Sequence, residues 1–145
     1  MSLNRSFIER NRASTNRIRE LVARLSDTEL QQPVGEHWTV AISLAHVAFW
    51  DRRMLYLLDQ TERAGKLVIP ELDIFVNDLS LPLWAAIPPR EAARLAIETA
   101  EAVDRRLEAF PPGLLEEIGA NNERWLVRAW HRDRHLDEVE AALRG

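Results

Sequence analysis

Two histidines near the end of the chain, His131 and His135, have a spacing that could do chemistry. Residues four apart on an α-helix lie one turn above the other on the same face, so two imidazoles at this separation can bind a single metal ion. Two protein ligands leave a metal site incomplete. The sequence contains four histidines, and His46 lies in its most apolar segment. The hypothesis is therefore a three-histidine site formed by His46, His131 and His135.

Other roles for these residues stay open. A single histidine on an apolar face, such as His46, is more often a core residue hydrogen-bonded to a neighbour. His37 precedes the cap of its helix and is expected in a loop, outside the site. Glu138, one turn beyond His135, could be a fourth ligand, an acceptor for a ligand histidine, or half of an exterior salt bridge. No residue is identifiable as a general base, so the catalytic residues are unknown.

Composition limits what kind of site the chain can carry. Its 145 residues are 46% hydrophobic and 29% charged with a net charge of -4, which is typical of one folded, soluble domain spanning residues 1–145. There is no cysteine, so a metal must bind to nitrogen or oxygen, and any thiol must come from outside the protein. The N-terminus lacks the apolar core of a signal peptide, and no apolar run approaches the roughly 18 residues of a membrane span. A cytoplasmic protein without a membrane segment is expected.

Apolar residues recur at helical spacing in four segments. No strand pattern competes with them, and Pro33 and Gly35 mark residues 26–38 as a connection. Thr39 is a good N-cap for the second helix, and either Asn121 or Asn122 can cap the fourth. These features predict an all-α fold, a four-helix bundle with a long connection between helices two and three. The expected helices cover residues 3–25, 39–65, 90–110 and 121–143, and the long connection covers 66–89 with a short helical turn within 71–79.

A simple bundle geometry brings the three histidines to similar heights. If the helices alternate in direction, the second and fourth run parallel, and depth from the helix start measures height. His46 lies seven residues past Thr39, and His131 and His135 lie nine and thirteen past Asn122. At 1.5 Å per residue these depths are roughly 10, 14 and 20 Å, close enough for side chains to converge. A crossover in the long connection would change which helices are neighbours, and the sequence leaves this open.

Two sets of arginines raise other possibilities. Arg124, Arg128 and Arg132 form a row four residues apart on the fourth helix, which we expect to be solvated. The alternative is contact with an anionic substrate, if the row borders an opening. The first helix is also rich in arginine, but no aromatic residues alternate with these charges and the whole chain is acidic, so we expect no nucleic-acid partner.

Several short motifs lie along the chain: Trp38-Thr39, Leu44-Ala45-His46 followed by Trp50-Asp51, and His131-x3-His135-Leu136-x2-Val139. Together they resemble the DinB/YfiT-like superfamily of metal-dependent proteins, across essentially the whole chain. The resemblance implies a four-helix bundle whose metal is held by one histidine of the second helix and a pair of histidines on the fourth. These roles correspond to His46, His131 and His135. Related members include thiol-dependent S-transferases and a mycothiol-dependent isomerase.

Three neutral imidazoles would leave a divalent metal ion, zinc or nickel being expected, with uncompensated charge and an open position. Such an ion can activate a low-molecular-weight thiol, as the resemblance implies for an S-transferase or isomerase, or generate a hydroxide for hydrolysis. The alternative is a non-catalytic bundle that acts through metal binding or oligomerisation, and a homodimer stays open. A small-molecule substrate is expected to contact the 66–89 connection and aromatic residues such as Trp50, Trp84 or Trp130.

Overall fold

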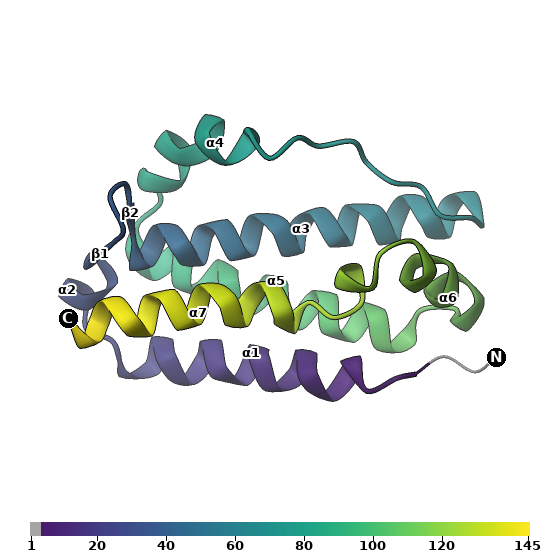
Figure 1. Cartoon of the computed structure of the whole chain (residues 1–145), viewed down its shortest axis with the longest axis horizontal. Helices are drawn as coiled ribbons and strands as arrows, with labels where there is room; N and C mark the ends of the chain where they lie inside the picture. Colours follow the sequence, from purple (N-terminus) through teal and green to yellow (C-terminus); the bar gives the residue numbers. More distant parts are fainter. Residues whose placement is uncertain (1–3) are drawn as a thin grey trace.

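The long helices pack side by side with their apolar faces inward (Figure 1). The structure is a computed structural model and describes residues 4–145. The second long helix, α3, packs against α5 and α7, and α1 packs against the same two helices from the other side. The prediction of an all-α chain is confirmed. The long helices are α1 (Phe7–Arg24), α3 (Val40–Ala64), α5 (Pro89–Ala109) and α7 (Ala129–Arg144).

Shorter elements connect these helices. The 26–38 segment, expected to be a plain connection, contains a helical turn and two paired strands of two residues each. The described residues contain seven α-helices and one 3-10 turn, where the sequence predicted four helices. No helix within residues 4–145 is long and apolar enough to cross a membrane. The short elements are α2 (Asp27–Leu30), β1 (Pro33–Val34), β2 (Trp38–Thr39), α4 (Val76–Ala85), α6 (Pro112–Asn121) and the 3-10 turn η1 (Glu123–Trp125).

Helix α3 has the limits that its sequence predicts. The Thr39 hydroxyl accepts a hydrogen bond from the amide of Ile42 at 3.1 Å and so satisfies one of the free donors of the first turn. Gly65 ends the helix in the left-handed conformation, with φ of 68°, and its amide bonds to the carbonyl of Thr61. These caps place His46 in the second turn of α3.

The fourth predicted helix begins later than expected. Its first turns, predicted from Asn121 or Asn122, instead contain the end of α6 and the turn η1, and α7 starts at Ala129. Asn122 does act as a cap, but for η1: its side-chain oxygen accepts a hydrogen bond from the amide of Arg124 at 3.0 Å. A capping residue shows that a helical turn begins and does not show how long the turn continues.

The long connection crosses back along the outside of α3 (Figure 1). Its helical part, α4, covers ten residues and lies further along the chain than the short turn predicted within 71–79. Because of this crossover, α3 and α5 run parallel. Ala41, Ala45 and Ala92 share one apolar cluster near both helix starts, and Leu58 and Leu107 share another toward both helix ends. The depth comparison assumed that the second and fourth helices run parallel. This condition does not hold, since α3 and α7 run antiparallel.

Three buried apolar clusters fill the interior. The first contains Leu44 of α3 and Leu136 of α7, the second contains Met54 of α3 and Ala129 of α7, and the third lies at the start of α3. On α7 the two histidines lie between Ala129 and Leu136, whereas His46 lies among apolar residues of α3. The antiparallel α7 returns toward the start of α3, which brings its histidines level with His46 despite the reversed direction.

Candidate metal centre and its cavity

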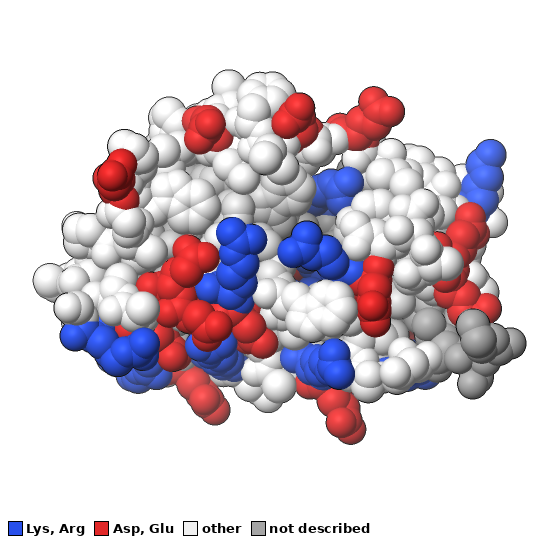
Figure 2. All heavy atoms as spheres, in the orientation of Figure 1, with Lys and Arg blue, Asp and Glu red and all other residues white. Residues whose placement is uncertain are grey.

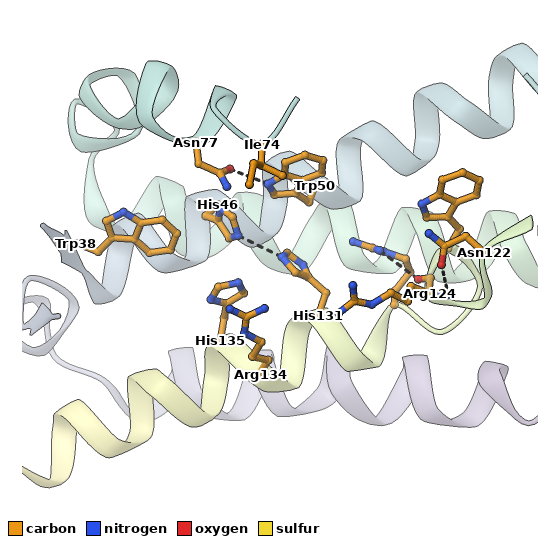
Figure 3. Close-up of a pocket in the computed structure, with 12 residues that line it drawn as sticks. Trp38, His46, Trp50, Ile74, Asn77, Asn122, Arg124, His131, Arg134 and His135 are labelled. Atoms are coloured by element: carbon orange, nitrogen blue, oxygen red, sulfur yellow. Dashed lines mark hydrogen bonds between the residues drawn. The ribbon is translucent and has the colours of Figure 1, made fainter. Parts of the chain in front are cut away.

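The rings of His46, His131 and His135 point toward one another from α3 and α7 (Figure 3). The ring centroids are 4.5 Å apart for His46 and His135, 4.7 Å for His131 and His135, and 5.1 Å for His46 and His131. One nitrogen from each ring can be chosen so that all three lie within 4.8 Å of one another. The structure therefore brings together the three histidines that the sequence singled out.

Burial keeps these imidazoles neutral. It lowers the pKa of His46 from 6.5 to about 3, with further lowering by repulsion from His135 when that ring is protonated and by the positive charge of Arg134. Burial likewise lowers the pKa of His131 to about 2, assisted by Arg128. The pKa of His135 is lowered by burial too, although Glu138 opposes the shift. At neutral pH each ring thus keeps a lone pair that can bind a metal ion.

The nitrogen positions fit a divalent metal ion. The Nε2 atoms of His46 and His131 are 3.1 Å apart, close to the roughly 3.3 Å expected for two ligands of a tetrahedral ion with bonds of about 2.0–2.1 Å. A hydrogen bond between the two rings fits the same distance, but it would satisfy only one nitrogen of each. The Nδ1 atoms of His46, His131 and His135 are buried and have no hydrogen-bond partner among residues 4–145. One ion can bind only one nitrogen of each ring, so an ion held by the Nε2 atoms of His46 and His131 leaves their Nδ1 atoms unpaired.

The histidines form one wall of a cavity of about 450 Å³, large enough for a small molecule. The long connection contributes Ile74 and Asn77, as predicted for this segment, and the Asn77 side chain accepts a hydrogen bond from Trp50 Nε1 at 2.9 Å. Of the three predicted aromatic residues only Trp50 lines the cavity. Trp84 packs edge-on against His46 within the core, and Trp130 is exposed. Sequence reasoning missed Trp38 and Trp125, which line the cavity as well.

The predicted solvated row of arginines is wrong for two of its three members. Arg124 is exposed, whereas the side chain of Arg128 is only 7% exposed and that of Arg132 is fully buried. The spacing of the arginines alone indicated a solvated face of the helix, although the apolar residues next to Arg128 and Arg132 in the sequence indicated an inward face. Arg124 and Arg128 line the cavity, together with Arg134, which the sequence did not single out.

A buried ionic cluster holds α7 against α3, α1 and α5, and sequence reasoning missed it. Arg132 Nε donates to Asp51 at 2.8 Å, and its Nη1 donates to Asp104 at 3.0 Å. Arg128 Nε donates to the second oxygen of Asp51 at 2.9 Å. Asn11 of α1 bonds to both sides of the α7 start, accepting from the amide of Ala129 and donating to a carbonyl of the preceding turn. A signal existed: Asp51 is an acidic residue within an apolar helix and needs a buried partner.

Glu138 and His37 lie outside the histidine cluster. The nearest oxygen of Glu138 is 3.7 Å from His135 Nδ1 and 3.6 Å from Arg134 Nε, and its side chain is half-exposed, which matches the exterior salt bridge better than a ligand. His37 is exposed in the loop between β1 and β2, as expected for a loop residue.

A comparison with known protein families identifies the family of this chain. The model of the mycothiol maleylpyruvate isomerase N-terminal domain matches residues 11–131. The chain belongs to this family. The family is part of the DinB/YfiT-like superfamily, so the resemblance seen in the sequence motifs is confirmed. The matched stretch includes His46 and ends at His131, so His135 lies beyond it. No curated protein and no solved structure matches the chain significantly.

Proposed function

We propose that this single-domain protein is a metal-dependent enzyme in which His46, His131 and His135 hold one divalent ion. The observation that carries the proposal is the convergence of three neutral imidazoles, two buried and one partly buried, whose ligand nitrogens lie within 4.8 Å of one another at the wall of a cavity. A closed structural site usually has four protein ligands, and this one has three with a cavity beside them. That arrangement favours a site at which a substrate binds.

The residues around the cluster would hold and orient a substrate. A divalent ion, when bound, would supply a Lewis acid that polarises a coordinated sulfur or oxygen group. Trp38 stacks on His135 with centroids 5.9 Å apart and packs 4.7 Å from His46, so it shields two of the rings from water. Trp50 is held in place by Asn77 of the long connection. No side chain beside the cluster is assigned as a general base.

The reaction class that we favour is thiol-dependent isomerisation or S-transfer. The family is named for a mycothiol maleylpyruvate isomerase, and the absence of cysteine means that a thiol would be a co-substrate from outside the chain. Hydrolysis by the same metal centre is the second candidate, supported by the general chemistry of open three-ligand sites. Imidazole ligands suit zinc, nickel, iron and copper alike, and of these we expect zinc or nickel.

The test is the metal content of protein that is purified without any chelator. We expect about one zinc or nickel ion per chain in the parent and in His37→Ala, whose histidine is exposed in a loop. His46→Ala and His131→Ala should lose the ion, because each removes one of three ligands. Retention of a full equivalent of metal by both variants would refute the site.

The activity test is consumption of a low-molecular-weight thiol and an electrophile by the metal-loaded protein, with hydrolysis of activated esters run in parallel. Turnover that disappears in His131→Ala and persists in His37→Ala supports the enzyme. A metal-loaded protein that turns over none of these substrates favours the alternative, a non-catalytic bundle acting through metal binding or oligomerisation. Homodimer formation and a cytoplasmic location stay predictions from the sequence.

A further inference from the structure

We propose that the arginine-lined end of the cavity is a carboxylate-binding subsite formed by Arg124 and Arg128 and assisted by Arg134. This inference rests on the proposed function for its location beside the histidines, and it names the charge of the substrate group that would enter there. The subsite itself uses only residues of η1, α7 and the turn between them, and it does not require a metal ion to be present.

The cavity lining has positive charge and no negative charge. Arg124, Arg128 and Arg134 line it, and no aspartate or glutamate is among the described residues that do so. Basic side chains border a hollow on the face of the molecule that shows α7 (Figure 2). This local charge contrasts with the whole chain, which has a net charge of -4. A cavity lined by one sign of charge attracts small ions of the opposite sign.

Arg128 is held in position as a fixed donor. Its Nε donates to Asp51 at 2.9 Å and its Nη1 to the carbonyl of Arg124 at 3.3 Å. The remaining nitrogen, Nη2, makes no hydrogen bond to any residue between 4 and 145, and it is not among the buried atoms without partners. Since Arg128 lines the cavity, this edge of its guanidinium is available to an acceptor there. Asp51 fixes the orientation, so little side-chain entropy is lost when an anion binds.

Arg124 has no carboxylate partner within the described part of the chain, whereas most of the arginines on the bundle surface do. Its backbone is fixed by Asn122, which accepts from its amide, and by Arg128, which donates to its carbonyl. Arg134 has only a distant partner, Glu138, at 3.6 Å. Two exposed guanidiniums without close partners at the edge of a cavity are suited to a planar, bidentate anion such as a carboxylate.

The arginines and the histidines line one cavity. Arg124, Arg128 and Arg134 share its wall with His46, His131 and His135, and Arg134 directly precedes His135 in α7. A substrate whose carboxylate binds the arginines can therefore reach the three imidazoles with the rest of its atoms. We expect a small molecule with a carboxylate at one end and its reacting group at the other.

The test measures binding of malonate to protein freed of metal and dialysed at pH 8, where the imidazoles are neutral. Malonamide, which has the same shape without charge, and inorganic phosphate are titrated at the same ionic strength. We expect malonate to bind at least about tenfold more tightly than malonamide, because charge-assisted hydrogen bonds are lost in the amide. Phosphate binding more tightly than malonate would overturn the assignment to a carboxylate.

Variants locate the subsite. Arg124→Gln and Arg128→Lys should each weaken malonate binding at least about fivefold, the second because lysine keeps the charge and loses the fork of donors. Arg105→Gln, an exposed arginine on α5 with the same change of net charge, is the control and should leave binding unchanged. Equal affinity in the parent and both cavity variants, or an equal loss in the control, overturns the subsite. The metal content of the same variants is measured separately. Malonate binding tests the carboxylate subsite and metal content tests the histidine site, so failure of one proposal is distinguishable from failure of the other.

Discussion

Helix α7 carries two buried polar clusters, and they differ in how completely their atoms are paired. Toward α1 and α5, Arg132 donates through all three of its nitrogens, to Asp51, Asp104 and the carbonyl of Ala100 among others. Toward the cavity, His131 and His135 each keep a buried Nδ1 atom without a partner. The first cluster is complete within the chain, and the second is not.

The difference separates a structural cluster from a functional one. Burying a charge costs several kcal/mol unless hydrogen bonds and opposite charges offset it. The ionic cluster meets this condition, so it can hold α7 against three other helices. The histidine cluster avoids the cost by staying neutral, and the lone pairs of its neutral rings leave it able to bind a metal ion. The following predictions test this contrast, from the largest expected effect to the smallest.

Removing the central cation of the ionic cluster should have the largest effect. We expect Arg132→Met to lower the free energy of unfolding by about 3–5 kcal/mol, because Asp104 loses its buried counter-charge and Asp51 keeps only Arg128. Urea denaturation followed by circular dichroism measures the change. The matched control is Arg134→Met, two residues further along α7 and exposed, which should change stability by less than about 0.5 kcal/mol. Similar stabilities for the two variants would show that the ionic cluster does not hold the fold.

Metal should stabilise the protein through the histidine cluster alone. Zinc at a free concentration one hundred times its dissociation constant should raise the free energy of unfolding by about 2.7 kcal/mol, since only the folded chain presents the three imidazoles together. The increase should vanish in His135→Ala. If zinc stabilises His135→Ala as much as the parent, the ion binds elsewhere.

Acid should destabilise the metal-free protein through the same histidines. Their folded pKa values, about 3 for His46 and about 2 for His131, lie below the ordinary value of 6.5, so the unfolded chain binds protons that the folded chain does not. Stability is therefore complete above pH 6.5 and falls as the pH is lowered toward 3, by up to about 1.4 kcal/mol per pH unit for each histidine. Unfolding curves at several pH values should show a shallower slope for His131→Gln than for the parent.

Replacing a histidine should matter least for the metal-free fold at neutral pH. We expect His131→Gln to change the free energy of unfolding by no more than about 1 kcal/mol at pH 7.5. The substitution loses the packing of the neutral ring, but it also removes the buried Nδ1 atom that has no hydrogen-bond partner, and the two effects partly cancel. Thermal unfolding in the presence and absence of zinc measures the stability of the zinc-bound and of the metal-free protein. A loss approaching that of Arg132→Met would mean that the histidines are structural.

Local signals predicted the parts of the fold that local chemistry controls. Thr39 and Gly65 mark the ends of α3 because a hydroxyl cap and a left-handed glycine act within one turn. The start of α7 was misplaced by about two turns because Asn122 caps a different, shorter turn. The crossover that makes α3 and α7 antiparallel has no signal in the loop sequence, since the connection 66–88 is long enough to return either way.

The sequence by itself determined that three histidines lie on the apolar sides of two helices and that the chain has no cysteine thiolate to add as a ligand. Periodicity and residue type suffice for that, because they depend on neighbours one turn away. Only the tertiary structure decided which helix faces meet, that Arg132 is buried against Asp51 and Asp104, and that Arg124 and Arg128 border the histidine cavity. These facts depend on pairs of residues far apart in the chain, whose contacts are set by helix direction and packing. That the histidines hold a metal ion stays a prediction.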